Sequence, residues 1–565
     1  MKTYILNKVF SKVKEAWPLC LFALLPLFAA CEDKLDEVPD NRTEIDTPEK
    51  VRLLLTSGYP SAVPAIICEL SGDNLVDNNV VKPATHRDAY ALFQDEAYRW
   101  VDINNYGTGE DDTPYQVWES YYQGIAVANH AIDAMSKISS DPASDPELAH
   151  SWGEAHVLRA YLHFVLLNVF AEAYKDQTQS RQDMGIPYVT KPETTVNVNY
   201  GDAEYRHSVA ETYDLIEKDL LEGINLIDDS KYKVPAYHFN RNAANAFAAR
   251  FYLYKREYAK VIQYADAALG SNAASSLRKW AAMSTNTIQS MLNSYNDETA
   301  PCNFLLQATY SLQDRMLSAR RFVINQGNTD YDVPDTKEII YGAGPNWSNR
   351  LPCYSGKIYR YGENDDGAWL FRVYEYFEYS DKIAGIGWVH IIYQPFTAEE
   401  TLLCRAEAKL YLGQRESALE DLNTWTASKQ ATTALTQARI NSFYTRARAN
   451  TYVSDLHPQD MSSEFKVLEG DDLAMLDCIL HFRRIETMFE GLRWFDIKRY
   501  GITVHHAYRG PLDYDVTQDD LYWNDKRRVL QIPNNVITAG YPVTDRTYTA
   551  PDTNSSETAT PLLAN

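Results

Sequence analysis

The chain has 565 residues, of which 45% are hydrophobic and 23% are charged, and its formal net charge is −23. These shares are those of an ordinary globular protein, and the length predicts one elongated domain or several lobes. Because an acidic surface repels phosphate backbones, and no basic stripe interleaved with aromatic residues occurs, the composition excludes nucleic acid as an expected partner.

Residues 1–30 have the pattern of an export signal. Four lysines precede the apolar run WPLCLFALLPLFAA, which is too short to span a bilayer but fits a signal peptide. Ala29 and Ala30 stand directly before Cys31, an arrangement that resembles a bacterial lipoprotein cleavage site. We expect lipidation of Cys31 and anchoring to a membrane by acyl chains, followed by a polar tether over residues 31–50. A plain secretory signal is the alternative.

The next part of the chain, residues 51–270, is predicted to be helical. Apolar residues recur there with a period of about 3.6, the pattern of amphipathic helices. The expected helices cover residues 117–135, 153–174, 206–227 and 240–270. Ser208 with Glu211 three residues later forms a capping box. The last stretch is expected to break near Lys255 and Arg256 into two helices.

Residues 240–270 resemble a tetratricopeptide unit, in which small alanines let two helices approach closely. Similar units occur at 397–425 and from about Met475 onwards. Recurring helix pairs predict a mainly α fold, an α-α superhelix. The intervening residues 271–396 are rich in Gly, Pro, Asn and Tyr and show little helical period. They are expected to form a long irregular insertion that carries the ligand face. The remaining residues, 397–565, form the C-terminal helical part.

Seven motifs in order resemble those of the SusD/RagB family of nutrient-binding outer-membrane lipoproteins. They are Cys31, Trp118 with Tyr122 and Ala128-Asn129, GEAHVLRAYLHFVLLNVFAEAY at 153–174, GIPYV at 185–189, AEAKLYLG at 406–413, RRIETMFEGLRWFDIKRYG at 483–501 and LQIP at 530–533. The resemblance implies a surface lipoprotein of the outer membrane that binds an oligosaccharide and acts, without catalysis, as the lid of a SusC-like TonB-dependent transporter. The same role for oligopeptides, or a tetratricopeptide scaffold for other proteins, is the alternative.

The stretch at 483–501 has charges that suggest either an active site or a structural joint. Four of its eight charged residues stand three, four and three positions apart: Arg483, Glu486, Glu490 and Arg493. They share one face if a single helix runs through them, although Gly491 is expected to break it. A glycosidase needs two carboxylates facing each other across a gap of roughly 5–9 Å. Glutamates that each have an arginine within reach are expected to stay ionised. We therefore interpret the stretch as a helix joint.

Ligand residues are expected in the two regions without helical period, near 70–115 and in 271–396. Aromatic rings stack on the C–H faces of sugars, and polar side chains pair with hydroxyls. Trp347 is the preferred stacking platform because it stands in a Gly-Pro-Asn loop, and Trp100 is the second. The other candidates are Tyr341, Asn346, Arg350, Tyr354, Asp77, Asn78, Asn104 and Tyr106. Packing within the loops, without ligand contact, is the alternative for each.

Neither a cofactor nor a metal is expected, and no enzyme signature was found. The sequence contains no HExxH, GxSxG, GxxxxGK[ST] or EF-hand pattern. The acidic run at 363–366 is interpreted as a solvated turn, with a calcium site as the alternative. Cys302 and Cys353 could form one disulfide, but the odd number of cysteines beyond Cys31 does not indicate a disulfide scaffold.

Overall fold

The computed structural model describes residues 44–77, 92–103, 111–193, 198, 200–283, 285–318, 321–324, 342–348, 350–355, 358–361, 367–449, 458–508 and 517–547. A compact unit begins at Asp46. The predicted signal peptide and Cys31 therefore lie outside the described residues. The first helix begins at Pro48, within the range expected for the tether, with Thr47 as its N-cap.

The N-terminal part of this unit is helical, as predicted. Its helices are α1 (Pro48–Thr56), α2 (Ala65–Ser71), α3 (Leu92–Tyr98), α4 (Pro114–Ile138), α5 (Ala149–Phe170) and α6 (Val209–Gly223). The capping box at Ser208 and Glu211 is present at the start of α6. Helix α5 is buried on nearly every side. Helix α5 can approach α6 closely because residue 153 is a glycine. A Cβ at this position would lie 2.7 Å from the Gly223 carbonyl oxygen.

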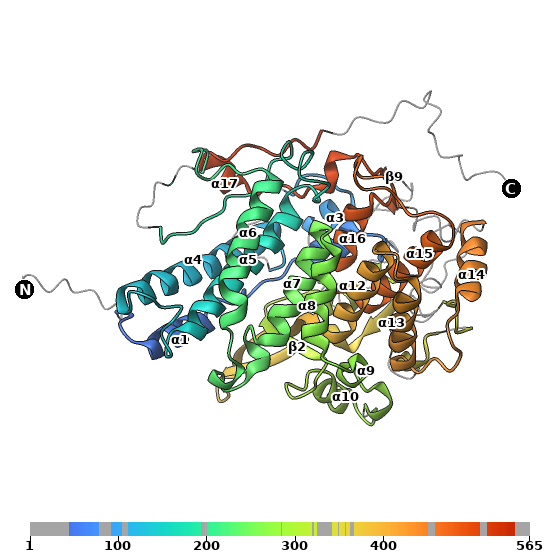
Figure 1. Cartoon of the computed structure of the whole chain (residues 1–565), viewed down its shortest axis with the longest axis horizontal. Helices are drawn as coiled ribbons and strands as arrows, with labels where there is room; N and C mark the ends of the chain where they lie inside the picture. The colour runs from blue at the N-terminus through green and yellow to red at the C-terminus, as the bar shows by residue number, and fades with distance from the viewer. Residues whose placement is uncertain are drawn as a thin grey trace, which may run out of the picture. The chain divides into compact units, whose positions relative to one another are not determined.

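Paired helices build the rest of the scaffold. They are α7 (Arg241–Lys255), α8 (Tyr258–Leu269), α12 (Ala398–Tyr411), α13 (Arg415–Ser428), α14 (Gln437–Ala449), α15 (Gly470–Glu486) and α16 (Leu492–Tyr500). The predicted break after Lys255 is confirmed, since Arg256 takes a left-handed conformation with φ 66°. Helix α12 packs against both α8 and α13 (Figure 1). The mainly helical, tetratricopeptide-like fold class is confirmed.

The range 271–396 contains more regular structure than the sequence indicated. Strands β2 (Asn303–Thr309), β7 (Ile386–Thr397) and β6 (Tyr376–Asp381) form an antiparallel sheet in that order. Its short helices are α9 (Ala273–Ser276), α10 (Ile288–Tyr295) and α11 (Gln313–Ser318). In this sheet, buried and exposed side chains alternate over only a few positions. The surrounding Gly and Pro residues obscure that short pattern in the sequence.

Three two-stranded sheets and some short turns complete the described residues. The sheets pair β1 (Val76–Asp77) with β3 (Phe322–Val323), β4 (Ile358–Tyr361) with β5 (Gly367–Leu370), and β8 (Val504–Tyr508) with β9 (Thr517–Leu521). Short helical turns occur at η3 (Ile224–Leu226), η4 (Asp229–Lys231), η5 (Pro235–Tyr237), η6 (Trp280–Ala282), η8 (Pro352–Tyr354), η9 (Phe371–Val373), η11 (Lys526–Arg528) and α17 (Asn534–Thr538). Cys302 and Cys353 are both buried thiols. None of the helices in the described ranges is long and apolar enough to cross a membrane.

Candidate functional site

The charged stretch at 483–501 forms two helices with a sharp break between them. Helix α15 ends at Glu486 and α16 begins at Leu492. Phe489 and Gly491 both adopt left-handed conformations, with φ 68° and 77°. A Cβ at Gly491 would also lie 3.0 Å from the Ala65 Cα, so glycine suits this position on two grounds. The break expected at Gly491 is confirmed, and the four charged residues therefore do not share one helical face beyond Glu486.

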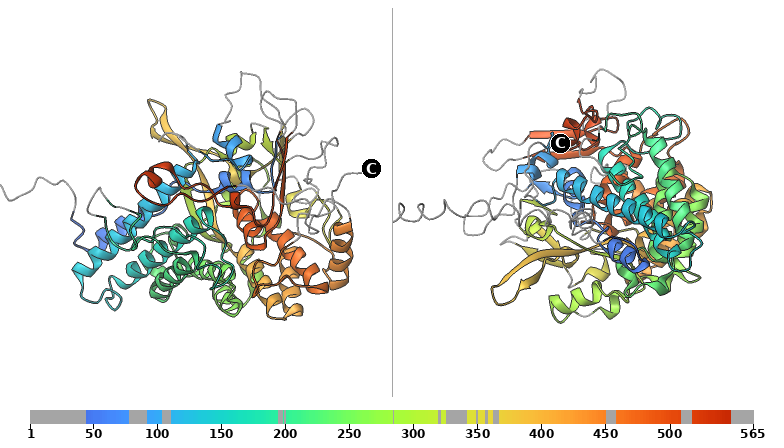
Figure 2. Two further views of the ribbon diagram at one scale, coloured as in Figure 1. Left: turned by 90° about the horizontal axis from the view of Figure 1, so that it is seen from above. Right: turned by 90° about the vertical axis from the view of Figure 1, so that its left-hand side faces the viewer.

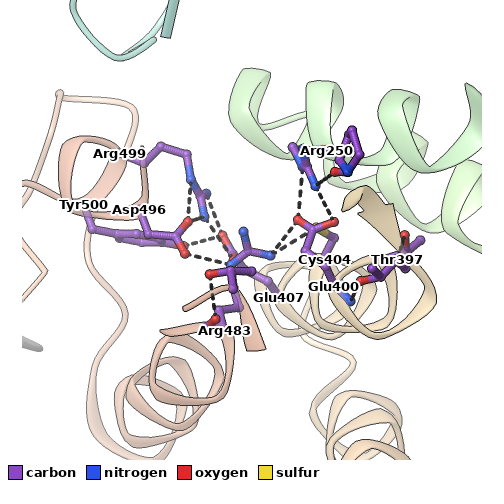
Figure 3. A network of polar contacts seen from close by, with 12 residues as sticks. Arg250, Thr397, Glu400, Cys404, Glu407, Arg483, Asp496, Arg499 and Tyr500 are labelled. Atoms are coloured by element: carbon purple, nitrogen blue, oxygen red, sulfur yellow. Dashed lines mark hydrogen bonds and ion pairs between the residues drawn. The ribbon is translucent and has the colours of Figure 1, made fainter. Parts of the chain in front are cut away.

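Arg483, on α15, connects three helices through its guanidinium group. Its Nε donates to Asp496 Oδ2 of α16 at 2.9 Å, and its Nη1 donates to Glu400 Oε1 of α12 at 3.3 Å. Thr397 caps the N-terminus of α12 and so fixes the turn that carries Glu400. Arg250 of α7 donates to the same glutamate, with Nε 3.2 Å from Oε1 (Figure 3). The network thus joins α7, α12, α15 and α16.

Arg499 extends this network on α16. Its Nη1 and Nη2 donate to the two carboxylate oxygens of Glu407 at 2.8 and 3.2 Å, and Nη2 also donates to Asp496 Oδ1 at 2.7 Å. The Tyr500 hydroxyl donates to Glu407 Oε1 at 2.6 Å (Figure 3). Three buried arginines are therefore balanced by three buried carboxylates.

The pKa shifts of Asp496 and Glu400 favour the ionised form of both carboxylates. Burial acts to raise the pKa of Asp496, but Arg483 and Arg499 outweigh burial and lower that pKa to about 2. Glu400 has a lowered pKa for the same reason, with Arg250 and Arg483 opposing its burial. A carboxylate held ionised by neighbouring guanidinium groups is a poor proton donor. These contacts join four helices, and the interpretation of the stretch as a helix joint stays a prediction.

A second ion pair connects α16 to the segment after α2. Arg493 donates to both oxygens of Asp73, with Nε–Oδ1 2.9 Å and Nη2–Oδ2 2.6 Å. Arg484 donates to the Asp73 carbonyl at 2.6 Å and to Asn74 Oδ1 at 2.9 Å. The two arginines outweigh burial and lower the pKa of Asp73 to about 2. Residues 420 positions apart in the chain are thereby held together.

The two glutamates of the stretch differ in their ionisation. Glu486 Oε2 accepts from Trp425 Nε1 at 2.7 Å and lies 2.5 Å from Lys429 Nζ, and its pKa is lowered because Lys429 and Arg372 outweigh its burial. Glu490 lies 3.1 Å from Arg372 Nη1, yet burial raises its pKa to about 8. The expectation that both glutamates stay ionised is therefore wrong for Glu490.

Glu490 borders a small cavity that also touches Arg372, Tyr393 and Gln394. The cavity has room for about one water molecule. It is too small for a sugar ring. This cavity therefore does not hold the predicted carbohydrate ligand.

The two tryptophans predicted as stacking platforms are buried. The Trp347 side chain packs 5.6 Å from the Phe482 ring, donates from Nε1 to the Gly342 carbonyl at 3.0 Å and is only 8% exposed. Trp100 is 1% exposed and stacks on His506 at 4.3 Å. The expectation of an exposed Trp347 ring is wrong because the loop folds the ring onto α15.

The other predicted ligand residues are buried, half-buried or outside the described part of the chain. Asn346 and Tyr354 are buried, with Asn346 donating to the Thr433 carbonyl at 2.8 Å. Asp77 is buried against Arg321, and Arg350 is half-buried. The remaining candidates, Tyr341, Asn78, Asn104 and Tyr106, lie outside the described residues, as does the acidic run 363–366. Ligand contact by any residue of this set stays a prediction.

Exposed aromatic side chains gather instead on a hairpin that the sequence reasoning missed. Strands β6 and β7 pair over residues 376–390, which we call the aromatic hairpin. Its large exposed side chains are Phe377 (48%), Tyr379 (52%), Ile383 (101%), Ile386 (61%) and Trp388 (43%). Figure 2 shows it projecting away from the neighbouring helices in both views. The segment YFEYSDKIAGIGWVH, with aromatic residues on both sides of an Ala-Gly turn, was the available signal.

Two family models match the sequence. One, described as "Starch-binding associating with outer membrane", matches residues 33–253, and one for the SusD family matches residues 398–551. A curated relative, SusD-like protein P38 from Formosa agariphila, is 25% identical over 542 residues, covering 88% of this chain and 93% of the relative.

Solved structures give the same fold. A SusD superfamily protein from Bacteroides fragilis has a TM-score of 0.59 at 16% identity, covering 88% of this chain and 99% of its own. A SusD-like carbohydrate-binding protein from Bacteroides vulgatus has a TM-score of 0.56 at 16% identity, with 87% and 96% covered. A laminarin-binding SusD-like protein has a TM-score of 0.51 at 15% identity, with 88% and 98% covered.

Proposed function

Because this chain belongs to the SusD family, we propose that it captures oligosaccharides at the cell surface and delivers them to a SusC-like TonB-dependent transporter, over which it closes as a lid. The main support for this proposal is that family models match both the N-terminal and the C-terminal parts of the chain. One of these models is described as starch-binding and outer-membrane associated.

Two further observations support a carbohydrate as the ligand. A structural neighbour with the same fold is named as laminarin-binding, and another as carbohydrate-binding. In addition, this chain exposes several large aromatic side chains on one hairpin. Aromatic rings are suited to the C–H faces of sugars.

We propose that binding occurs without chemical turnover. Glycoside hydrolysis needs an acid with a raised pKa and a second carboxylate across a gap that admits the sugar. The buried carboxylates Glu400 and Asp496 have lowered pKa values and lie against guanidinium groups. Glu490 has the raised pKa of an acid but borders a cavity with room for about one water.

The proposed location is the outer face of the outer membrane, with acyl chains on Cys31 as the anchor. A lipid anchor leaves the whole binding unit outside the bilayer while tying it to the membrane that holds the transporter. This arrangement raises the effective concentration of the two partners.

A glycan screen with parallel detection of products tests the proposal. The purified protein is run in native gels containing neutral glucans, starch and laminarin among them, and reducing-sugar release is followed in the same mixtures. We expect retarded migration in at least one glycan and no release. Release of sugar would contradict the non-catalytic role, and binding of oligopeptides in place of every glycan would support the alternative ligand class. Co-purification of a TonB-dependent transporter from detergent-solubilised outer membranes tests the lid role separately.

A further inference from the structure

We propose that the indole ring of Trp388, on the aromatic hairpin, is a stacking platform for a neutral oligosaccharide, and that Glu378 beside it is the hydroxyl acceptor. This inference rests on the proposed function and names its contact site. The evidence for it is the strand register of the hairpin, the hydrogen bond that orients the Trp388 ring and the carboxylate of Glu378 beside that ring.

The register places four side chains on one face of the hairpin. Glu378 of β6 lies directly opposite Trp388 of β7, and Tyr376 lies opposite His390. Opposed residues of an antiparallel pair project from the same face, as do residues two positions apart on one strand. Tyr376 and His390 stack at 5.5 Å with an interplanar angle of 19°. This face therefore runs from a stacked pair near the body of the protein to the exposed Trp388 ring.

A hydrogen bond fixes the indole without covering it. Trp388 Nε1 donates to Glu378 Oε2 at 3.2 Å, and the Trp388 side chain is still 43% exposed. The indole has one donor, so this bond satisfies its polar group and leaves an apolar ring available. A ring that is already oriented loses less conformational freedom when a ligand stacks on it.

Glu378 supplies the polar half of the site. An ionised carboxylate accepts hydrogen bonds at two oxygens and has capacity for sugar hydroxyls beyond the one bond from the indole. The same negative charge disfavours acidic sugars, and the chain as a whole carries a formal charge of −23. The ligand class is therefore a neutral oligosaccharide.

The opposite face of the hairpin offers an internal control. Phe377 and Tyr379 lie there in an edge-to-face arrangement, with ring centroids 4.7 Å apart. The Phe377 ring packs toward Gly387, where an added Cβ would lie 2.8 Å from Phe377 Cε1. On that face the two rings contact each other, and the residues opposite them, Val389 and Gly387, carry no carboxylate.

The test compares four variants of the purified protein for affinity to the best-binding neutral glucan of the screen. Trp388→Ala is expected to weaken binding by about tenfold or more, the loss typical of a central aromatic contact. Glu378→Ala is expected to weaken it less. Trp523→Ala removes a tryptophan of similar exposure, 46%, in another part of the chain, and is expected to leave affinity within about twofold. Phe377→Ala, on the opposite face, is expected to do the same.

Each outcome decides between the inference and the proposed function. Wild-type binding that persists in Trp388→Ala, or that is lost equally in Trp523→Ala, would overturn the inference and leave the function standing. A wild-type protein that binds no glycan would overturn the function and the inference together. Binding of a polyuronate as tight as that of laminarin would overturn the neutral ligand class. Unchanged thermal unfolding of Trp388→Ala shows that the variant is folded.

Discussion

Trp425 and Trp388 each donate from the indole nitrogen to a glutamate, and their settings are opposite. Trp425 Nε1 lies 2.7 Å from Glu486 Oε2, and its ring is fully buried and stacked on Phe482 at 4.5 Å. Trp388 Nε1 lies 3.2 Å from Glu378 Oε2, and its ring is 43% exposed. A tryptophan–glutamate hydrogen bond connects helices α13 and α15 in the first case. In the second case it leaves the tryptophan ring exposed to solvent. The hydrogen-bonded pair alone therefore does not distinguish a ring packed between helices from a ring available to a ligand; the exposed fraction of the ring does.

This contrast extends to the regions around the two tryptophans. The 483–501 stretch buries charged side chains, among them Arg483 and Asp496. The aromatic hairpin instead exposes the rings of Phe377, Tyr379 and Trp388. Burial of charges requires paired partners, and exposure of aromatic rings suggests a ligand.

The largest effect is expected from Arg483→Met in the buried network. The variant keeps much of the volume but leaves Asp496 and Glu400 each with one guanidinium fewer, at a cost of about 3–5 kcal/mol in the free energy of unfolding. Denaturant titration measures it. Arg415→Ala, which removes a partly exposed arginine paired with Asp472, is the control and is expected to cost less than about 1 kcal/mol. Equal losses in the two variants would contradict a structural role for the network.

The second comparison truncates each tryptophan in turn. Trp425→Ala is expected to lower the free energy of unfolding by about 3 kcal/mol or more, because it leaves a cavity and removes a donor from buried Glu486. Trp388→Ala is expected to change it by less than about 0.5 kcal/mol, because its ring contacts solvent. Thermal and urea unfolding of both variants measure the difference. A large stability loss in Trp388→Ala would mean that the hairpin ring is part of the core.

The smallest of these effects is a pH dependence carried by Asp73. Its pKa is lowered from 3.8 to about 2 in the folded protein, so its contribution is fully present above about pH 4 and is lost as the pH falls toward 2. A shift of this size corresponds to roughly 2 kcal/mol. Asp73→Asn is expected to unfold more easily at pH 7, and its difference from wild type is expected to shrink below pH 4.

The control for this pH dependence is Asp133→Asn, which removes an exposed carboxylate paired with Lys137 on α4. Its effect on the free energy of unfolding is expected to stay below about 0.5 kcal/mol between pH 7 and pH 3. A difference between Asp73→Asn and wild type that does not change with pH would contradict an ionised Asp73–Arg493 pair.

Much of the helical scaffold could be predicted from sequence because its signals are local. The capping box at Ser208 and the break after Lys255 depend on neighbouring residues only, and both are confirmed. The partners of the charged stretch are not local. Arg493 pairs with Asp73, 420 residues away, and spacing within 483–501 carries no information about that partner. The burial of Trp347 is likewise set by α15, which lies far along the chain.

The aromatic hairpin could have been predicted from the sequence, but the residues around it obscure its pattern. Its two strands lie within a range rich in Gly and Pro, and the turn Ala384-Gly385 gives a short signal. Exposure of an aromatic side chain cannot be derived from alternation alone, because a strand with one buried face has the same pattern. Only the packing of the sheet shows whether a given aromatic side chain lies on the buried face or on the exposed face.

The most direct measurement is a crystal structure of the protein with an oligosaccharide of the best-binding neutral glucan. We expect sugar density over the Trp388 indole, with a hydroxyl within hydrogen-bond distance of the Glu378 carboxylate. Sugar density elsewhere on the surface, with Trp388 still exposed to solvent, would contradict this expectation.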